Sequence, residues 1–319
     1  MAALLMAACG GQSGGAGTPS ATARALTLHA SFFALPTAGS APTGLVVGPD
    51  GALWVTEENG DGIARVTTAG TTSEFALPRP GAPGLSIVSG PDGALWFTDR
   101  GADEVDRLTL SGSFRAIHLP RGSSPLGICA GPLQSLWVTQ SSTGELDRIA
   151  LNGMVTPVAQ LGATASPVAI VQGHDGNLWV SEAGAIARVT PQGSITAYPL
   201  AMPGAGTLRI VNGSGGDLWF TEQTAGAVGH ISLKGLITML PALLNQPTGI
   251  VEGPDGHMWV AEEGAGRIDR VDGSSLTAFT VPQSGSEPED IVAGPRRTLW
   301  FTDFHTGLVA TFSADAPAG

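Results

Sequence analysis

The densest group of side chains able to do chemistry is acidic. Three carboxylates fall within four residues, in the stretch Glu287, Pro288, Glu289 and Asp290. Carboxylate oxygens at that density suit Mg²⁺ or Ca²⁺, and they suit a cationic ligand equally well. A solvated acidic turn before a strand would give the same sequence. Glu287, Glu289 and Asp290 are therefore candidate metal ligands, and Glu287 and Glu289 are candidate catalytic residues.

Other familiar catalytic arrangements are missing from the sequence. The six histidines are scattered, and none forms an H-x-x-H or HExxH pattern with metal-ligand spacing. No G-x-S-x-G elbow, phosphate-binding loop or dinucleotide fingerprint occurs in a strand–turn–helix context. Lys234 is the only lysine, so Schiff-base chemistry would rest on it alone. Cys129 lies in an apolar run without an activating histidine nearby, and we expect a small buried hydrophobe there.

The composition favours a β-rich domain and excludes several partners. The chain has 319 residues, of which 42% are hydrophobic and only 13% are charged. Its 46 glycines and 23 prolines suit many short strands and turns better than long helices. A net charge of −12 disfavours binding to nucleic acid or to anionic lipid headgroups. The sequence thus predicts an all-β protein whose partner is not a polyanion.

All seven tryptophans occupy one repeated position, at intervals of 40–42 residues. Each follows Leu or Met and precedes Val or Phe. That period is the length of a four-stranded propeller blade, so seven copies predict a seven-bladed β-propeller. Each indole can bury about 150–250 Å² between adjacent blades, which explains its constant place in the repeat. The seven are Trp54, Trp96, Trp137, Trp179, Trp219, Trp259 and Trp300.

The two ends of the repeat array predict how the ring closes. The last repeat lacks a fourth strand, whereas residues 28–35 match the fourth-strand pattern and precede the first repeat. The N-terminal strand is therefore expected to complete the last blade, which pairs two otherwise exposed edges. The predicted propeller spans residues 27–314, and a short tail follows at 315–319.

A separate segment precedes the propeller. Residues 1–9 are apolar and end in Met-Ala-Ala-Cys at Cys9, which resembles the lipobox of bacterial lipoproteins; a disordered apolar tail is the alternative. Residues 10–26 are rich in Gly, Ser, Ala and Thr and suit a flexible linker. Elsewhere no stretch approaches the roughly 20 apolar residues of a membrane span. We expect lipidation at Cys9 and an extracytoplasmic protein, either secreted or anchored to the bacterial envelope through that lipid alone.

A polar residue, acidic in six of the seven repeats, recurs three positions after each tryptophan, and a basic residue recurs in the strand that follows. In a hairpin centred on residue 61, Glu57 would face Arg65 across the two strands. The pattern therefore predicts a repeated cross-strand ion pair rather than a metal-binding ring. In the last repeat Thr311 would stand opposite Asp303, which leaves Asp303 open to another role.

Propellers usually bind ligands at the mouth of the central channel, where the first strand of each blade begins. Most positions there are small or apolar in this chain. Polar residues gather instead in the fifth, sixth, seventh and first repeats. The candidate ligand-binding residues at this rim are Thr43, Arg209, Gln246, Thr248 and Asp290, beside the carboxylates described above.

Three of the repeat units read GPDGALWVTE, GPDGALWFTD and GPDGHMWVAE, with third strands like IARVT and fourth strands like EFALP. In these units, over about residues 27–314, the chain resembles the virginiamycin B lyase (streptogramin lyase) family. The resemblance implies a seven-bladed propeller. It also implies a carbon–oxygen lyase that opens cyclic depsipeptide antibiotics by elimination at an ester bond, assisted by Mg²⁺.

The functional residues of that family match this chain only in part. In the lyases a Pro-His pair opens the sixth blade, and a Glu-Pro-His triplet opens the seventh. Here residues 246–248 read Gln-Pro-Thr and residues 287–289 read Glu-Pro-Glu, so Thr248 and Glu289 stand where the lyases have histidine. Threonine has no basic form near neutral pH, whereas a glutamate can act as general base if a neighbouring carboxylate raises its pKa. The family's further acidic residue falls near Phe304.

Three functions remain open on the sequence. The first is a tethered propeller that binds a small molecule or an envelope protein through its rim, without chemistry. The second is a divergent lyase or hydrolase in which Glu287, Glu289 and Asp290 act with Mg²⁺ or Ca²⁺. The third is a scaffold of the cell envelope. We expect a monomer in each case.

Overall fold

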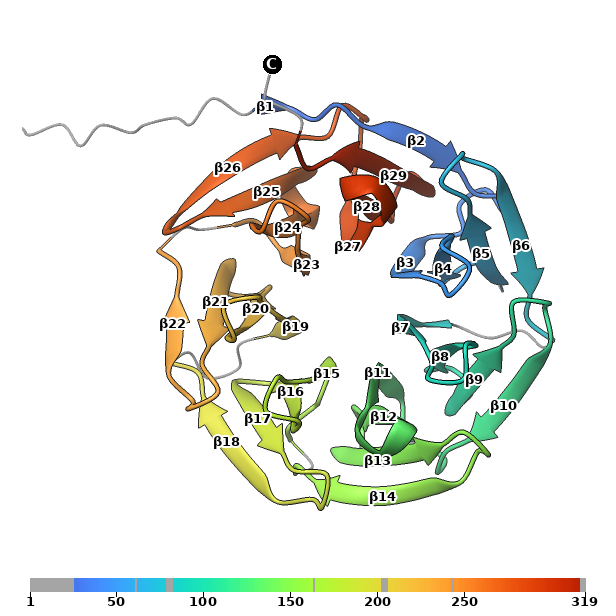
Figure 1. The fold of residues 1–319 in the computed structure, drawn as a ribbon, viewed down its shortest axis with the longest axis vertical. Coiled ribbons are helices and arrows are strands. Elements are labelled where there is room, and N and C mark those ends of the chain that lie inside the picture. The colour runs from blue at the N-terminus through green and yellow to red at the C-terminus, as the bar shows by residue number, and fades with distance from the viewer. Residues whose placement is uncertain are drawn as a thin grey trace, which may run out of the picture.

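The computed structural model describes residues 26–60, 62–78, 83–162, 164–201, 206–241 and 244–315. They form seven sheets arranged in a ring around one axis (Figure 1). The seven-bladed, all-β architecture expected from the tryptophan spacing is confirmed. None of the described residues forms a helix long and apolar enough to cross a membrane. The predicted lipidation site, Cys9, lies outside the described residues.

Each blade runs outward from the axis in sequence order (Figure 1). The innermost strands are β3 (Pro42–Val47), β7 (Pro83–Ser89), β11 (Pro125–Gly131), β15 (Ile170–Gln172), β19 (Thr207–Asn212), β23 (Pro247–Glu252) and β27 (Pro288–Gly294). The second strands carry the tryptophans and are β4 (Leu53–Glu57), β8 (Leu95–Asp99), β12 (Ser135–Gln140), β16 (Leu178–Glu182), β20 (Leu218–Glu222), β24 (Met258–Glu262) and β28 (Thr298–Asp303).

The outer half of each blade is equally regular. The third strands are β5 (Gly62–Val66), β9 (Glu104–Leu108), β13 (Glu145–Ala150), β17 (Ala185–Val189), β21 (Ala227–Ile231), β25 (Arg267–Asp272) and β29 (Leu308–Ser313). The outermost strands of blades one to six are β6 (Thr72–Ala76), β10 (Phe114–His118), β14 (Val155–Gln160), β18 (Ile195–Pro199), β22 (Ile237–Met239) and β26 (Ser275–Thr280). Short 3₁₀ turns lie at η1 (Pro132–Gln134), η2 (Glu263–Ala265) and η3 (Pro295–Arg297).

The N-terminal strand closes the ring, as the sequence predicts. Strand β2 (Ser31–Ala34) pairs antiparallel with β29 and becomes the fourth strand of blade seven. Phe33 stacks on Trp300 at 5.5 Å between ring centroids, so the closing strand is also packed against the core. The preceding strand β1 (Leu26–Thr27) adds a parallel fifth strand to blade six by pairing with β26. The N-terminal segment thus links the last two blades.

The tryptophans pack between neighbouring blades. Six of them are almost fully buried, and one core cluster combines Trp300 and Val309 of blade seven with Leu45 and Leu53 of blade one. Cys129 is buried in another such cluster, where burial raises the pKa of its thiol to about 12. The prediction of a small buried side chain at this position is confirmed, and a thiol with a raised pKa forms little of the reactive thiolate near neutral pH.

The predicted ion pair between Glu57 and Arg65 is wrong. The turn between β4 and β5 falls earlier than expected, so Glu57 pairs with Gly62 and Arg65 lies opposite Trp54. Because the register differs by an odd number of residues, Arg65 moves to the other face of the sheet. Its Nε instead contacts Oδ2 of Asp50 at 2.7 Å, and the guanidinium lies 5.8 Å from the centroid of Trp54.

This contact belongs to a repeated unit of one aspartate, one tryptophan and one arginine, which we call the turn triad. In blade one, Trp54 Nε1 donates to Asp50 Oδ1 at 3.0 Å while Arg65 holds Oδ2. The same three contacts recur in blades two and four, with Asp92, Trp96 and Arg107 and with Asp175, Trp179 and Arg188. The recurring arginine therefore anchors the turn between the first two strands.

Candidate functional site

The inner rim lies at the end of the ring where the first strands begin. Asp290, at the start of β27, accepts a hydrogen bond from Arg209 Nη2 of blade five at 3.0 Å. The same carboxylate oxygen accepts the backbone N–H of Leu45 in blade one at 3.1 Å. Burial raises the pKa of Asp290, and Arg209 and the backbone N–H groups of Leu45 and Ile291 offset part of that rise. Arg209 and Asp290 thus connect three blades, as well as adding polarity to the rim.

Glu289 occupies the centre of the acidic rim. Its side chain is mostly buried, and burial is the main cause that raises its pKa to about 7. The carboxylates of Glu263, Asp290 and Glu58 raise that pKa further, whereas Arg209 lowers it. A group of carboxylates close enough to shift one another's protonation makes a strongly negative surface that favours cations.

A depression of about 510 Å³ lies between blades six and seven. Glu287 and Gln246 line it, as the sequence predicts for rim residues, and His305 and Glu263 line it too. His305 Nδ1 lies 4.0 Å from Glu287 Oε2. Burial and the neighbouring Glu287 carboxylate raise the pKa of Glu263. The depression therefore has acidic walls and one exposed imidazole.

Thr43 and Thr248 do not present ligand-binding groups at the rim, contrary to expectation. Each is 1% exposed. The Thr248 hydroxyl donates to the Pro288 carbonyl of the next blade at 3.0 Å. Thr43 Oγ1 shares a hydrogen bond with Thr56 Oγ1 at 2.9 Å, and its carbonyl accepts from Thr302 of blade seven at 2.9 Å. Both threonines are therefore part of the packing between blades.

These threonines belong to an inner ring of hydroxyls that joins neighbouring blades. The hydroxyl two positions after the tryptophan donates to a carbonyl of the next blade in several repeats. The pairs are Thr98 with Leu126 at 2.9 Å, Thr139 with Val168 at 3.1 Å, Thr221 with Thr248 at 2.7 Å and Thr302 with Thr43 at 2.9 Å. Blade six has Ala261 at this position, and the Thr248 hydroxyl on the adjoining strand supplies the missing bond.

Asp303 is also structural rather than open to another role. It is fully buried, and its two oxygens accept the Ser286 hydroxyl at 2.6 Å and the Glu287 N–H at 3.1 Å. Asp303 also accepts the Thr306 N–H of the following turn, as the equivalent acids do in two other blades: Asp99 accepts the Ala102 N–H and Glu222 accepts the Ala225 N–H. In these three blades the recurring acid therefore anchors a loop or turn, with partners different from those predicted.

The three candidate metal ligands share the rim without converging. Among the described residues, no group of three or more His, Cys, Asp or Glu side chains is arranged to hold a metal ion. Glu287 lies near His305 and lines the depression, whereas Asp290 is bound by Arg209 and by the Leu45 N–H. This donor set does not fit a three-carboxylate cation site.

Sequence reasoning missed Glu58 and Glu263, which both reach the rim. They occupy the same repeat position, four residues after the tryptophan, at the start of the turn that leaves the second strand. Glu58 contacts Arg100 of blade two at 3.3 Å, and Glu263 accepts a hydrogen bond from Gln223 of blade five at 3.2 Å. Their periodicity was available in the sequence, but only the ring geometry brings them near Glu289.

Comparison with known proteins places this propeller in a family. The model of the virginiamycin B lyase family matches residues 25–185 and 131–317. The chain belongs to the virginiamycin B lyase family. A search of curated protein sequences gives no match.

Solved structures of this family have the same fold. A streptogramin B lyase structure is 26% identical with a TM-score of 0.83, and the match covers 89% of this chain and 97% of that one. Virginiamycin B lyase from Staphylococcus aureus is 27% identical with a TM-score of 0.83, covering 88% and 98%. A catalytically inactive histidine-to-alanine variant of the Staphylococcus aureus enzyme, with quinupristin, matches equally well.

More distant similarities extend to the fold alone. The extracellular domain of a hybrid two component system from B. thetaiotaomicron is 12% identical with a TM-score of 0.67, and the match covers 85% of this chain and 40% of that one.

Proposed function

We propose that this family member binds a cationic ligand at its inner rim and has lost the lyase chemistry of its relatives. The observation that carries the proposal is Glu289, a mostly buried carboxylate at a position where the lyases have histidine. Burial and three neighbouring carboxylates raise its pKa to about 7. A bound cation would favour the ionised form of this group, because its charge offsets both the burial and the carboxylate repulsion that raise the pKa.

The second substituted position argues against the family's reaction. Thr248 is buried and its hydroxyl donates to the Pro288 carbonyl. A buried hydroxyl that already donates to a backbone carbonyl cannot take a proton from a substrate near neutral pH. One basic position of the lyase pattern is thus filled by a residue that joins blades six and seven.

The charge of the rim selects the ligand class. Two rim carboxylates have guanidinium partners, Glu58 with Arg100 and Asp290 with Arg209. Glu263, Glu287 and Glu289 add further negative charge at the same place. An amine-bearing or other cationic molecule would be attracted, and an anionic one repelled.

Calorimetric titration with spermidine, and separately with Mg²⁺ and Ca²⁺, tests the proposal. We expect Glu289→Gln to weaken spermidine binding about tenfold, which is the effect of losing roughly 1.4 kcal/mol from one partly desolvated charge contact. Glu74→Gln is the control, because Glu74 bonds to Thr37 on the outer part of blade one. Equal affinities for the wild type and Glu289→Gln would overturn the proposal.

A divergent lyase or hydrolase is the second candidate. It is favoured by the Glu287 and His305 pair beside the depression, together with a Glu289 pKa near 7 that suits a general base. Incubation with quinupristin, followed by mass spectrometry, separates the two functions. Ring opening that disappears in Glu289→Gln would establish the enzyme, and an intact antibiotic supports the binding module.

We infer that the protein works outside the cytoplasm as a monomer, held to the envelope by lipid at Cys9 or secreted. The lipobox-like sequence supports this inference. Mass spectrometry of the protein from membranes would detect the lipid mass on Cys9, and Cys9→Ser should release the protein. An envelope pull-down that recovers a stoichiometric protein partner would favour a scaffold over a small-molecule binder.

A further inference from the structure

Blade five departs from the turn triad on the face opposite the inner rim. Its turn reads Gly-Ser-Gly-Gly-Asp, so Gly215 stands where blade one has Asp50, and Asp217 comes two residues later. His230 replaces the recurring arginine. It stacks on Trp219 at 4.8 Å between ring centroids and bonds to Asp217 Oδ2 at 2.8 Å.

This rearrangement leaves the Trp219 indole without a hydrogen-bond acceptor among the described residues. In blades one, two, four and six the tryptophan Nε1 donates to an aspartate of the turn. In blade three it donates to the Pro132 carbonyl, and in blade seven to the Thr298 hydroxyl. Trp219 is also partly exposed, unlike the other six. Tryptophan N–H groups usually have an acceptor in a folded protein, so the open N–H shows that this turn leaves one edge of the Trp219 ring uncovered.

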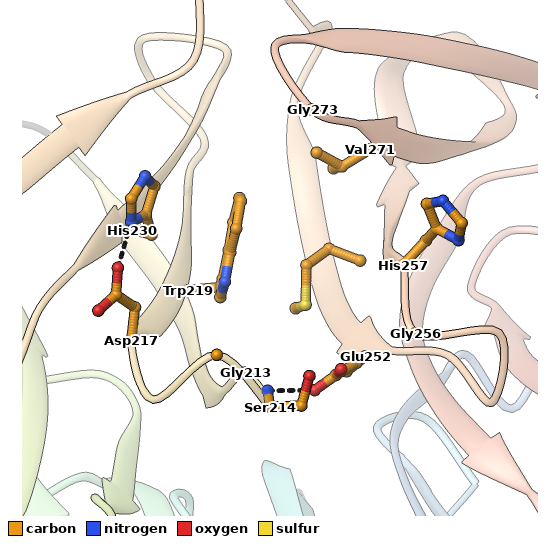
Figure 2. A pocket seen from close by; sticks show the side chains of 12 residues that line it. Gly213, Ser214, Asp217, Trp219, His230, Glu252, Gly256, His257, Val271 and Gly273 are labelled. Atoms are coloured by element: carbon orange, nitrogen blue, oxygen red, sulfur yellow. Dashed lines mark hydrogen bonds and ion pairs between the residues drawn. The ribbon is translucent and has the colours of Figure 1, made fainter.

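The partly exposed Trp219 lines a cavity of about 320 Å³ that opens between blades five and six. Figure 2 shows Trp219 with His230 on one side, and Val271 and Glu252 across the opening. Met258 adds to the apolar wall. The volume is at the lower end of small-molecule sites, which are mostly apolar with a few placed polar groups.

The polar groups of this cavity favour a cation. Two carboxylates, Asp217 and Glu252, line it, and its twelve described lining residues include no lysine or arginine. Glu252 Oε2 accepts the Ser214 N–H at 2.6 Å, which fixes the carboxylate at the opening. The face of an indole also attracts cations, by about 0.5–2 kcal/mol depending on burial.

We propose that this cavity, formed by Trp219, Glu252, Met258 and Val271, binds a small organic ammonium ion with an apolar group. The ammonium lies against Glu252 near the Trp219 ring, and the apolar group packs on Met258 and Val271. The site is independent of the inner rim, since it opens on the other face of the ring.

The probe is 2-phenylethylamine, titrated into the full chain by calorimetry or by NMR of the tryptophan indole N–H signals. Two variants change the cavity. Glu252→Gln removes the charge. Gly215→Asn places a neutral acceptor where Asp50 lies in blade one, and an added Cβ at Gly215 meets no atom within 4 Å. We expect each variant to weaken binding at least about fivefold, while Glu74→Gln on the outermost strand of blade one leaves it unchanged. Glu289→Gln is measured as well, because it reports any binding of the amine at the inner rim.

Three results would overturn the proposal. The first is that the amine does not bind the wild type at concentrations up to about 10 mM. The second is that the wild type and both cavity variants bind it with equal affinity. The third is that only Glu289→Gln loses binding. The last result would assign the amine to the inner rim. Gly215→Asn and Glu252→Gln act by different means, so misfolding of one leaves the other as a valid test.

Discussion

Glu57 offers a direct test of how burial controls charge in this ring. It is fully buried at the end of β4, and neither carboxylate oxygen accepts a hydrogen bond from a described residue. Burial raises its pKa from 4.5 to about 7; the nearby Ser40 hydroxyl offsets part of this, and the Glu74 carboxylate adds to it. Glu57→Gln would remove the charge, and blade three already has Gln140 at the equivalent position.

The magnitude follows from the shift. At about 1.4 kcal/mol for each pKa unit, a rise from 4.5 to about 7 makes ionised Glu57 cost about 3 kcal/mol. The folded chain holds this proton more tightly than the unfolded chain. Stability therefore falls as pH rises from about 4.5 to about 7 and stays low above that range. Glu57→Gln should be the more stable protein at alkaline pH, by up to about 3 kcal/mol, and should lose that advantage below about pH 5.

Urea unfolding followed by tryptophan fluorescence, at about pH 5 and about pH 8.5, measures the difference. Other buried acids contribute equally to both proteins and cancel. Asp99→Ala in blade two is the comparison: it is expected to destabilise at both pH values, because it removes the acceptor of the Ala102 N–H, which lies 3.0 Å from the Asp99 carboxylate. A difference between wild type and Glu57→Gln that does not change with pH would refute the reasoning.

Three further predictions concern the scaffold. Phe33→Ala should lower the free energy of unfolding by about 2 kcal/mol, because the Phe33 ring packs β2 against Trp300. An unchanged urea midpoint would contradict closure of the ring by β2. Asp92→Asn should cost about 1–2 kcal/mol at pH 7. Burial alone would raise the pKa of Asp92, but bonds from its indole and arginine partners lower it overall, so the cost should shrink as pH falls below 3.8, the usual pKa of an aspartate. Thr302→Val should cost about 1–3 kcal/mol in chemical denaturation, because it removes the hydroxyl bond from blade seven to blade one, and Thr302→Ser should recover most of it.

The rim carboxylates were only partly predictable. Glu287, Glu289 and Asp290 are adjacent in the chain, so their grouping needs no tertiary information. The contact between Arg209 and Asp290 joins blades five and seven, and the approach of Glu58 and Glu263 to Glu289 joins blades one, six and seven. Those distances depend on closure of the ring. The burial of Thr43 and Thr248 likewise follows from contacts with neighbouring blades that a single repeat does not contain.

The sequence by itself determined the number of blades, the place of each tryptophan and the closing role of the N-terminal strand. Each of these rests on a period of 40–42 residues, and a pattern repeated seven times averages out local ambiguity. The tertiary structure alone decided the register between β4 and β5, and with it the true partner of Arg65. A shift of a few residues at a glycine-rich turn changes little locally but moves side chains to the other face of a sheet. The opening at Trp219 also became visible only in three dimensions, because its walls come from two blades.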